Sequence, residues 1–293
     1  MLRKGFVTLW RVIIFVAMVL LAYETSFFLF PYIGHHTPLL PAIIIMYSLF
    51  AYVLVPLLFR LFRLISRANH VPTHVTTGDG WPVDPVNIAM TVKNRRHLVR
   101  AMKAAGWHES DKLSLRNDIR AIYAFIFDKP YPEAPLSRLY MFGRPQDVSF
   151  QIPVGTSPRV RHHVRFWRVD PRMPGTKQHR FWWNTLRNMV GAERELWVGS
   201  ATFDSRFIGI KWRNLQITHQ ISSDTDKERD FLIKTLEDTN HLRRTTDVKA
   251  GEPYQFRGQN FGITITSDGY IKLCELKRPL SLYVKNMLVS DEK

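Results

Sequence analysis

The sequence predicts an α+β protein, with a mostly antiparallel sheet and a few packed helices, preceded by a two-helix transmembrane hairpin. Three observations support this fold class: two long apolar runs near the N-terminus, later segments that alternate apolar and polar residues, and others with apolar residues at helical spacing. The 293 residues divide into a hairpin (1–67), a linker (68–85), a main α+β domain (86–242) and a C-terminal β-rich extension (243–293).

Two apolar runs, residues 12–30 and 41–59, predict membrane spans. Each run has 19 residues. At 1.5 Å per residue, a helix of that length covers about 29 Å, which matches the hydrocarbon core of a bilayer. A cleaved signal peptide is the alternative for the first run, but the run is long for a signal peptide and no small-residue cleavage site follows it. We therefore expect an integral membrane protein in contact with membrane lipids.

Basic residues flank the two runs on one side of the predicted membrane. They are Arg3, Lys4, Arg11, Arg60, Arg63 and Arg67. The loop that connects the runs, residues 31–40, contains no Lys or Arg. Because segments rich in Lys and Arg stay in the cytoplasm, both termini and the whole chain after Arg67 are expected there.

The chain is strongly basic and contains one cysteine. Its net charge is +16, of which about +11 lies outside the hairpin. A basic domain tethered to a bilayer faces anionic headgroups, and each Lys or Arg near the surface contributes about 1 kcal/mol. Nucleic acid is the competing anionic partner, but the membrane tether favours lipid. The single Cys274 excludes an intramolecular disulfide framework and a cysteine-rich metal site.

The first half of the main domain predicts one strand and two helices. After the Thr-, Gly- and Pro-rich linker, a short strand is expected at 86–90 and a helix at 94–105, with Gly106 as its C-terminal cap. A second helix is expected at 114–127. It carries one apolar stripe, formed by Leu115, Ile119, Ile122, Tyr123 and Ile126.

Residues 139–167 form the most distinctive stretch of the chain. It begins with an FGRPQD turn that holds Arg144 and Asp147. The glycine of this turn tolerates positive φ, and the proline disfavours helix in the residue before it. Two alternating runs, 148–152 and 161–167, then predict strands separated by a Gly/Pro loop.

The second of these strands places two adjacent histidines on opposite faces. Since neighbours in a strand point to opposite sides, His162 lies with apolar residues and His163 lies between Arg161 and Arg165. His163 is expected to face solvent or an anion, and His162 a core or a pocket. The candidate residues for binding an anionic lipid or a phosphorylated ligand are Arg144, Asp147, Arg161, His163 and Arg165. A solvated basic strand edge is the competing interpretation.

A second set of residues carries a hypothesis of catalysis. In the predicted strand 215–221, His219 lies on the apolar face, and Asp204 ends the strand before it. His162, His219 and Asp204 are the candidate catalytic residues, with Asp147 as an alternative carboxylate. Such a set can bind zinc or perform acid–base chemistry near neutral pH. No HExxH or CxxC motif specifies a metal, so the metal, the cofactor and the question of enzymatic activity stay open.

The remaining segments predict two more helices and a run of strands. Residues 173–194 hold a short amphipathic helix that either lies on the bilayer or caps the core. Asp224 or Asp226 is the N-cap of a further helix. The extension after residue 242 alternates like strands, with Ser267-Asp268-Gly269 as a hairpin turn, and either extends the sheet or forms an appendage.

Four segments occur in the order seen in LssY C-terminal-type domains: SRLYMFGRPQDVSFQ, SPRVRHHVRFW, LWVGSATFD and ISSDTDKERDFLIKTL. The chain resembles that family from about residue 86 to residue 236. The resemblance implies a bacterial membrane-associated protein, and hence the inner membrane. Relatives are often fused to lipid-phosphatase-type membrane domains or named for a type I secretion locus. This chain has two predicted spans and no Ser-Gly-His motif, so phosphatase activity is not carried over.

Two functions compete on this sequence. In the first, a membrane-anchored protein binds anionic lipid, a phosphorylated ligand or a membrane partner through its basic cytoplasmic domain, as an accessory to secretion or envelope processes. In the second, the domain is a membrane-surface hydrolase that uses His162, His219 and Asp204. The second function requires these three side chains to line one pocket.

Overall fold

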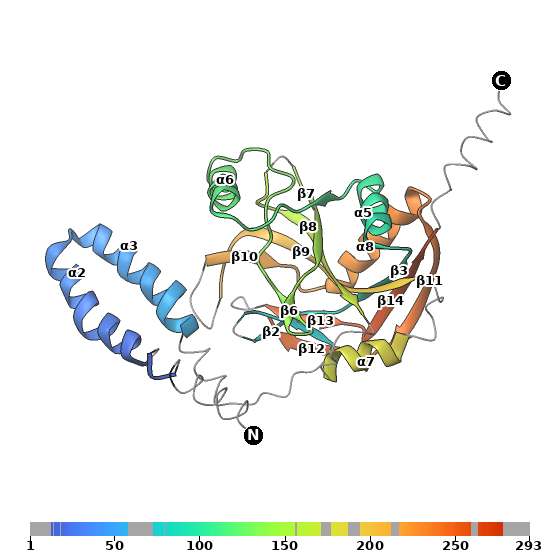
Figure 1. Ribbon diagram of the computed structural model, residues 1–293. Coiled ribbons are helices and arrows are strands. Elements are labelled where there is room, and N and C mark those ends of the chain that lie inside the picture. Colours follow the sequence, from blue (N-terminus) through green and yellow to red (C-terminus); the bar gives the residue numbers. More distant parts are fainter. Residues whose placement is uncertain are drawn as a thin grey trace.

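The computed structural model describes residues 13, 15–17, 19–57, 73–78, 80–155, 157–170, 177–186, 194–211, 217–258 and 263–277 (Figure 1). Within these ranges the backbone alone is described for residues 177–180, 185, 206–209, 217–219 and 254.

Two apolar helices come first in the chain and lie side by side as a hairpin (Figure 1). The helix from Phe15 to His36 includes a π-helical turn, η1 (Thr25–Leu29), and α2 (Phe30–His36). The helix from Leu39 to Leu57 includes α3 (Leu39–Leu49) and a second π-helical turn, η2 (Phe50–Leu54). Both are long and apolar enough to cross a membrane.

The connection between these helices is shorter than the sequence predicts. Helix α2 continues through His36, so only Thr37 and Pro38 separate it from α3. Pro31 lies inside the first helix, directly after the π-helical turn η1. A wider turn can accommodate a residue that lacks a backbone N–H, which is why this proline does not end the helix.

The described part of the domain is built on an eight-stranded sheet. Its order is β11 (Leu242–Lys249), β14 (Tyr270–Leu276), β3 (Ile88–Val92), β9 (Glu195–Ile210), β8 (Arg161–Val169), β7 (Val148–Pro153) and β4 (His108–Glu109), with β10 (Ile217–Ile221) paired to the end of β9. The β14–β3 pair is parallel and the other pairs are antiparallel. The predicted α+β class with a mostly antiparallel sheet is confirmed.

Two smaller sheets complete the described strands. One has the order β2 (Pro82–Pro85), β1 (His74–Thr76), β5 (Tyr140–Met141) and β6 (Arg144–Pro145), and the other pairs β12 (Tyr254–Arg257) with β13 (Thr264–Ser267). The segment expected to be a linker therefore contains two strands, whose Val75 and Val83 are buried. These valines anchor the segment because they pack in the second hydrophobic core.

Four helices accompany the sheets in the described domain. They are α5 (Arg95–Ala104), α6 (Leu115–Ile126), α7 (Lys177–Leu186) and α8 (Thr225–Asp238). The side chain of Asn94 caps α5 by accepting a hydrogen bond from the backbone N–H of His97, and Asp224 caps α8 by accepting from Asp226 and Lys227. The helices predicted from apolar periodicity and capping residues are thus present.

The main sheet has a hydrophobic core on each face. Helices α5 and α8 cover one face, where Phe166 of β8 packs with Leu98 and Leu232. The small β2-β1-β5-β6 sheet and α7 cover the other face, where Trp167 packs with Trp182. The predicted helix in 173–194 therefore caps the core, because Trp182 is buried there rather than exposed to a bilayer.

The C-terminal extension contributes to two sheets. Strand β14 lies between β11 and β3 and extends the main sheet, whereas β12 and β13 form a separate two-stranded pair. The predicted hairpin at Ser267-Asp268-Gly269 is wrong: the turn exists, with Gly269 at φ 79°, but β13 and β14 do not pair with each other. The chain turns a corner there, from the β12–β13 pair into the large sheet.

Candidate functional site

Strand β8 distributes its side chains over both faces of the sheet, as strand alternation predicts. His162 lies on the side of α8, and Arg161, His163 and Arg165 lie on the opposite side. The expectation that His163 faces solvent is wrong, because its exposed fraction is 3%. Arg161 and Arg165 are buried as well. The side chains that the sequence predicts to face an anion are therefore enclosed in the protein.

We call this enclosed group the buried polar layer. Its members come from β2, β7, β8 and β9: Asp84, Ser149, Gln151, Arg161, His163, Arg165, Ser200, Thr202 and Asp204. The proline-rich segment after α6 helps to cover it. Gln151 donates a hydrogen bond to the carbonyl of Ala134 (2.6 Å), and Arg165 donates to the hydroxyl of Ser137 (3.4 Å).

Arg161 makes two side-chain contacts within this layer. Its Nε donates to Oδ2 of Asp204 at 3.1 Å, and its Nη1 donates to Oε1 of Gln151 at 2.8 Å. Arg161 and Asp204 are directly opposite in the β8–β9 register, so backbone pairing brings the two charges together. The guanidinium is already neutralised by a neighbour inside the protein, which argues against its use as a headgroup ligand.

His163 lies between a hydroxyl and a carboxylate. Its Nε2 is 2.7 Å from Oγ1 of Thr202, and its Nδ1 is 3.6 Å from Oδ2 of Asp204. Thr202 is the register partner of His163 on β9. A hydroxyl, an imidazole and a carboxylate in this order can transfer a proton from the hydroxyl to the ring, with the carboxylate orienting the imidazole.

Asp84 and Arg165 form the second ion pair of the layer, with Oδ2 and Nη1 3.8 Å apart. Burial raises the pKa of Asp84 to about 6, although Arg165 opposes this effect. Burial also lowers the pKa of Arg165. Among the described residues, Oδ1 of Asp84, Nε and Nη1 of Arg165 and Oγ of Ser200 have no hydrogen-bond partner. Such open buried groups with shifted pKa values are typical of functional sites.

His162 makes a different set of contacts. Its Nδ1 is 2.7 Å from Oε2 of the buried Glu228, and its ring stacks on Phe203 and Phe231 at centroid distances of 4.6 and 4.1 Å. Burial raises the pKa of Glu228, and the hydrogen bond with His162 opposes the rise. The carboxylate and the two rings fix His162 against α8.

The sheet therefore separates His162 from Asp204, and the two candidates do not share a site. The reason is register: Asp204 faces Arg161 across β8 and β9, which puts its side chain on the face away from His162. His219 is in β10, but its side chain lies outside the described residues. Among the described residues, no group of three or more His, Cys, Asp or Glu could hold a metal ion.

Arg144 and Asp147 brace the FGRPQD turn. They form an ion pair with each other. Arg144 also donates to the carbonyl of Arg168 at 2.6 Å, and Asp147 accepts from the backbone N–H of Arg168 at 2.7 Å. Both contacts tie the turn to the end of β8, so these two candidates have structural partners while remaining partly exposed.

Sequence reasoning missed several residues of these clusters, among them Asp84, Thr202 and Glu228. Asp84 falls in the segment expected to be a linker, Thr202 lies in an ordinary alternating strand, and Glu228 resembles an ordinary first-turn acid. A signal existed for Asp84, which is the lone acid in the apolar run WPVDPVNIAM. Its burial follows from β2 packing over the main sheet.

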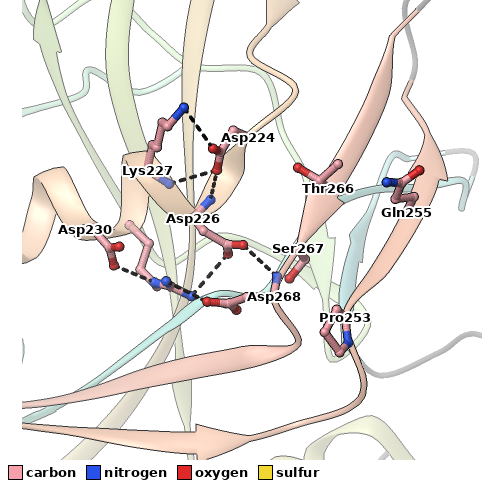
Figure 2. A pocket seen from close by; sticks show the side chains of 10 residues that line it. Asp224, Asp226, Lys227, Asp230, Pro253, Gln255, Thr266, Ser267 and Asp268 are labelled. Atoms are coloured by element: carbon pink, nitrogen blue, oxygen red, sulfur yellow. Dashed lines mark hydrogen bonds and ion pairs between the residues drawn. The ribbon is translucent and has the colours of Figure 1, made fainter.

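A separate cavity of about 690 Å³ opens at the start of α8 (Figure 2). Figure 2 shows the carboxylates of Asp226, Asp230 and Asp268 near one another in the lining of this cavity. Arg229 is buried and pairs with Asp226 (3.1 Å), Asp230 (2.9 Å) and Asp268 (3.0 Å). Burial alone would lower the pKa of Arg229, but the hydrogen bonds to Asp268 and Asp230 raise it. This arginine joins α8 to the corner after β13.

Comparison with known proteins identifies the family. The sequence model described as LssY C-terminus matches residues 68–271. Searches of curated proteins and of solved structures returned no match. The matched region begins before β1, ends in β14, and contains the whole buried polar layer and α8. It is wider than the region of resemblance read from the motifs. The chain therefore belongs to the LssY C-terminus family.

Proposed function

We propose that the chain is an integral protein of the bacterial inner membrane whose basic cytoplasmic domain binds anionic lipid. The observation that carries the proposal is the exposure of the two N-terminal helices. Only 6% of the most apolar window of Phe15–His36 and 17% of that of Leu39–Leu57 is buried inside the protein. Side chains such as Leu39 and Phe27 point outward. Apolar surface of this extent is stable in a bilayer, where helices also satisfy their own backbone groups.

The distribution of charge supports the orientation and the ligand. The basic flanks of the hairpin favour a cytoplasmic location for both termini. Because Arg161, His163 and Arg165 are enclosed, headgroup contact is assigned to exposed cations on the helices instead. They include Lys93, Arg96, Arg100 and Lys103 on and beside α5, and Lys112, Arg116 and Arg120 on and beside α6. A phosphorylated soluble ligand or a membrane partner would use the same cations.

Extraction and lipid analysis test this proposal. The full chain should remain in the membrane pellet after alkaline carbonate treatment, and anionic lipid should be enriched among the lipids that co-purify in mild detergent. High salt should remove that enrichment, because exposed charges are screened. Release of the chain by carbonate would refute the anchor. Equal recovery of anionic and zwitterionic lipid would refute the lipid preference.

A hydrolase acting at the membrane surface is the second candidate, and the geometry of His163 favours it. Here Thr202 is the nucleophile, His163 the base and Asp204 the group that orients the base. The full chain would be assayed with fluorogenic acyl and phosphate esters. Activity that disappears in His163→Gln and Thr202→Val, and persists in His162→Gln, is the expected result. Hydrolysis no faster than the uncatalysed rate in buffer would rule out the hydrolase.

A further inference from the structure

Helix α6 carries its apolar stripe on the outside of the domain. The stripe side chains are each more than half exposed: Leu115 79%, Ile119 59%, Ile122 58%, Tyr123 53% and Ile126 57%. Helices α5 and α8 bury their apolar residues in the core, which is the usual arrangement in a soluble domain. The inner side of α6 is held by small residues, since Ala124 packs on Tyr131 and Ala134.

The exposed surface continues past the helix and is firmly held. Phe127, after the helix, and Val154, in the β7–β8 loop, are also exposed. Arg159 joins the two parts, because its Nε and Nη2 donate to the carbonyls of Phe125 and Ile126, each at 2.7 Å. These bonds satisfy carbonyl groups at the C-terminal end of α6 and fix the helix to the loop. We call the exposed apolar residues of α6, with Phe127 and Val154, the α6 patch.

Charged residues border the α6 patch, and cations outnumber the acids Asp118 and Asp128. Lys112, Arg116, Arg120 and Lys129 are exposed on and beside the helix. The guanidinium of Arg120 lies 3.9 Å from the centroid of the Tyr131 ring, so it is held beside the patch. An apolar helix face with an excess of Lys and Arg beside it suits a helix that lies in the interface of an anionic membrane.

The tether keeps the domain that carries the α6 patch near a bilayer. Sixteen Cα–Cα steps separate Leu57, at the end of the second apolar helix, from Thr73 in the domain. Fully extended, this connection reaches about 55 Å at most. A tethered group experiences a high effective concentration of its target, so a shallow apolar contact suffices for stable docking.

We propose that α6 is a second membrane contact of this chain, and that the α6 patch inserts into the headgroup–acyl boundary of the anionic leaflet beside the hairpin. This inference rests on the membrane anchor proposed above. It adds an orientation: the domain lies on the bilayer with α6 downward, parallel to the surface. About 18 Å of helix would then lie in the interface.

A fluorescent label in the full chain tests this contact. The variant Ile122→Cys is labelled with an environment-sensitive dye and reconstituted in nanodiscs whose acyl chains are brominated quenchers. The matched control is Lys234→Cys, an exposed position on α8. The native Cys274 is buried and burial raises the pKa of its thiol to about 12, so the dye reacts at the introduced cysteine.

In nanodiscs of anionic lipid, the label at position 122 should lose most of its emission, and the label at position 234 should keep it. Adding Ile119→Glu should restore the emission at position 122. Water-like, unquenched emission at position 122 would overturn the proposal. Blue-shifted emission that brominated lipid does not quench would also overturn it, because protein, such as a second copy, would then cover the patch.

Carbonate extraction of the same labelled chain distinguishes a failure of the membrane anchor from a failure of the α6 contact. If the chain is released from membranes, the proposed anchor fails. If it stays in the membrane while position 122 remains unquenched, only the α6 contact fails. Thermal unfolding of each variant in detergent confirms that the substitutions, which replace exposed side chains, leave the fold intact.

Discussion

Asp84 and Arg165 carry opposite charges inside the buried polar layer, and each charge compensates the other. A salt bridge in the interior adds little net stability, but removal of one partner leaves an uncompensated charge and costs about 3–5 kcal/mol. The pair also links the small sheet to the main sheet, since Asp84 lies in β2 and Arg165 in β8. The packing of the two sheets therefore depends on this pair.

The first prediction concerns Arg165→Met. The folded chain holds the pKa of Asp84 at about 6. An unfolded aspartate titrates near 4, so the folded state binds this proton more tightly. The stabilising contribution of protonated Asp84 is present below about pH 4 and is lost as pH rises through about 6. Without Arg165 this pKa rises further, so the variant should be less stable by about 3–5 kcal/mol at pH 8 and by much less at pH 5.

Denaturant unfolding of the full chain in detergent measures this effect at both pH values. The matched control is Asp84→Asn combined with Arg165→Met, which removes both charges and should recover most of the loss. Equal destabilisation at both pH values, or no recovery in the double variant, would show that the pair does not have the assigned role.

Part of this layer could be predicted from the sequence. Strand alternation places Arg161, His163 and Arg165 on one face, and this is what the structure shows. Their burial could not be predicted, because it depends on β2 and the proline-rich segment folding over that face. The grouping of His162 with Asp204 failed because the register of β8 against β9 depends on tertiary pairing.

At the scale of elements, Arg229 fastens α8 to the corner between β13 and β14. It donates to both carboxylate oxygens of Asp268 (3.1 and 3.0 Å) and to the carbonyl of Tyr270 (3.2 Å). A planar guanidinium can satisfy these acceptors at once, whereas the lysine ammonium is a point charge. This contact explains why Ser267-Asp268-Gly269 makes a corner: Asp268 points at α8 and its backbone N–H donates to Asp226.

The second prediction follows from this contact. Arg229→Met should lower the free energy of unfolding by about 1–3 kcal/mol, because the acceptors lose a buried donor while solvent compensates part of the loss at the exposed Asp230 and Asp268. Arg229→Lys should recover part of the loss. The control is Lys227→Met on the same helix, whose side chain is 84% exposed and should contribute little. Similar melting temperatures for Arg229→Met and Lys227→Met would contradict the assignment.

The elements themselves were largely predictable, and their partners were not. Periodicity and capping residues located α5, α6 and α8, since these signals are local. Helical spacing correctly places the apolar residues of α6 on one face. Whether that face is buried or exposed depends on which other elements pack against it, and the sequence does not give this. The insertion of β14 between β11 and β3 joins residues more than 180 positions apart, which no local pattern encodes.

At the scale of the whole molecule, the domain requires its C-terminal strands. The third prediction compares two truncations. A chain that ends after Lys277 keeps every described strand and should fold, whereas a chain that ends after residue 242 loses β14 and exposes the edge of β3. Unpaired sheet edges promote aggregation. Size-exclusion chromatography in detergent should give a monodisperse species for the longer chain and aggregates for the shorter one, and identical profiles would contradict this view of the fold.

The central claim is that the hairpin anchors the domain on the cytoplasmic side of the inner membrane, and protease accessibility in oriented vesicles tests it most directly. The domain is detected by an antibody after proteolysis of right-side-out and of inverted inner-membrane vesicles. The account predicts that the domain is digested in inverted vesicles and protected in right-side-out vesicles. Digestion in right-side-out vesicles with protection in inverted ones would contradict it.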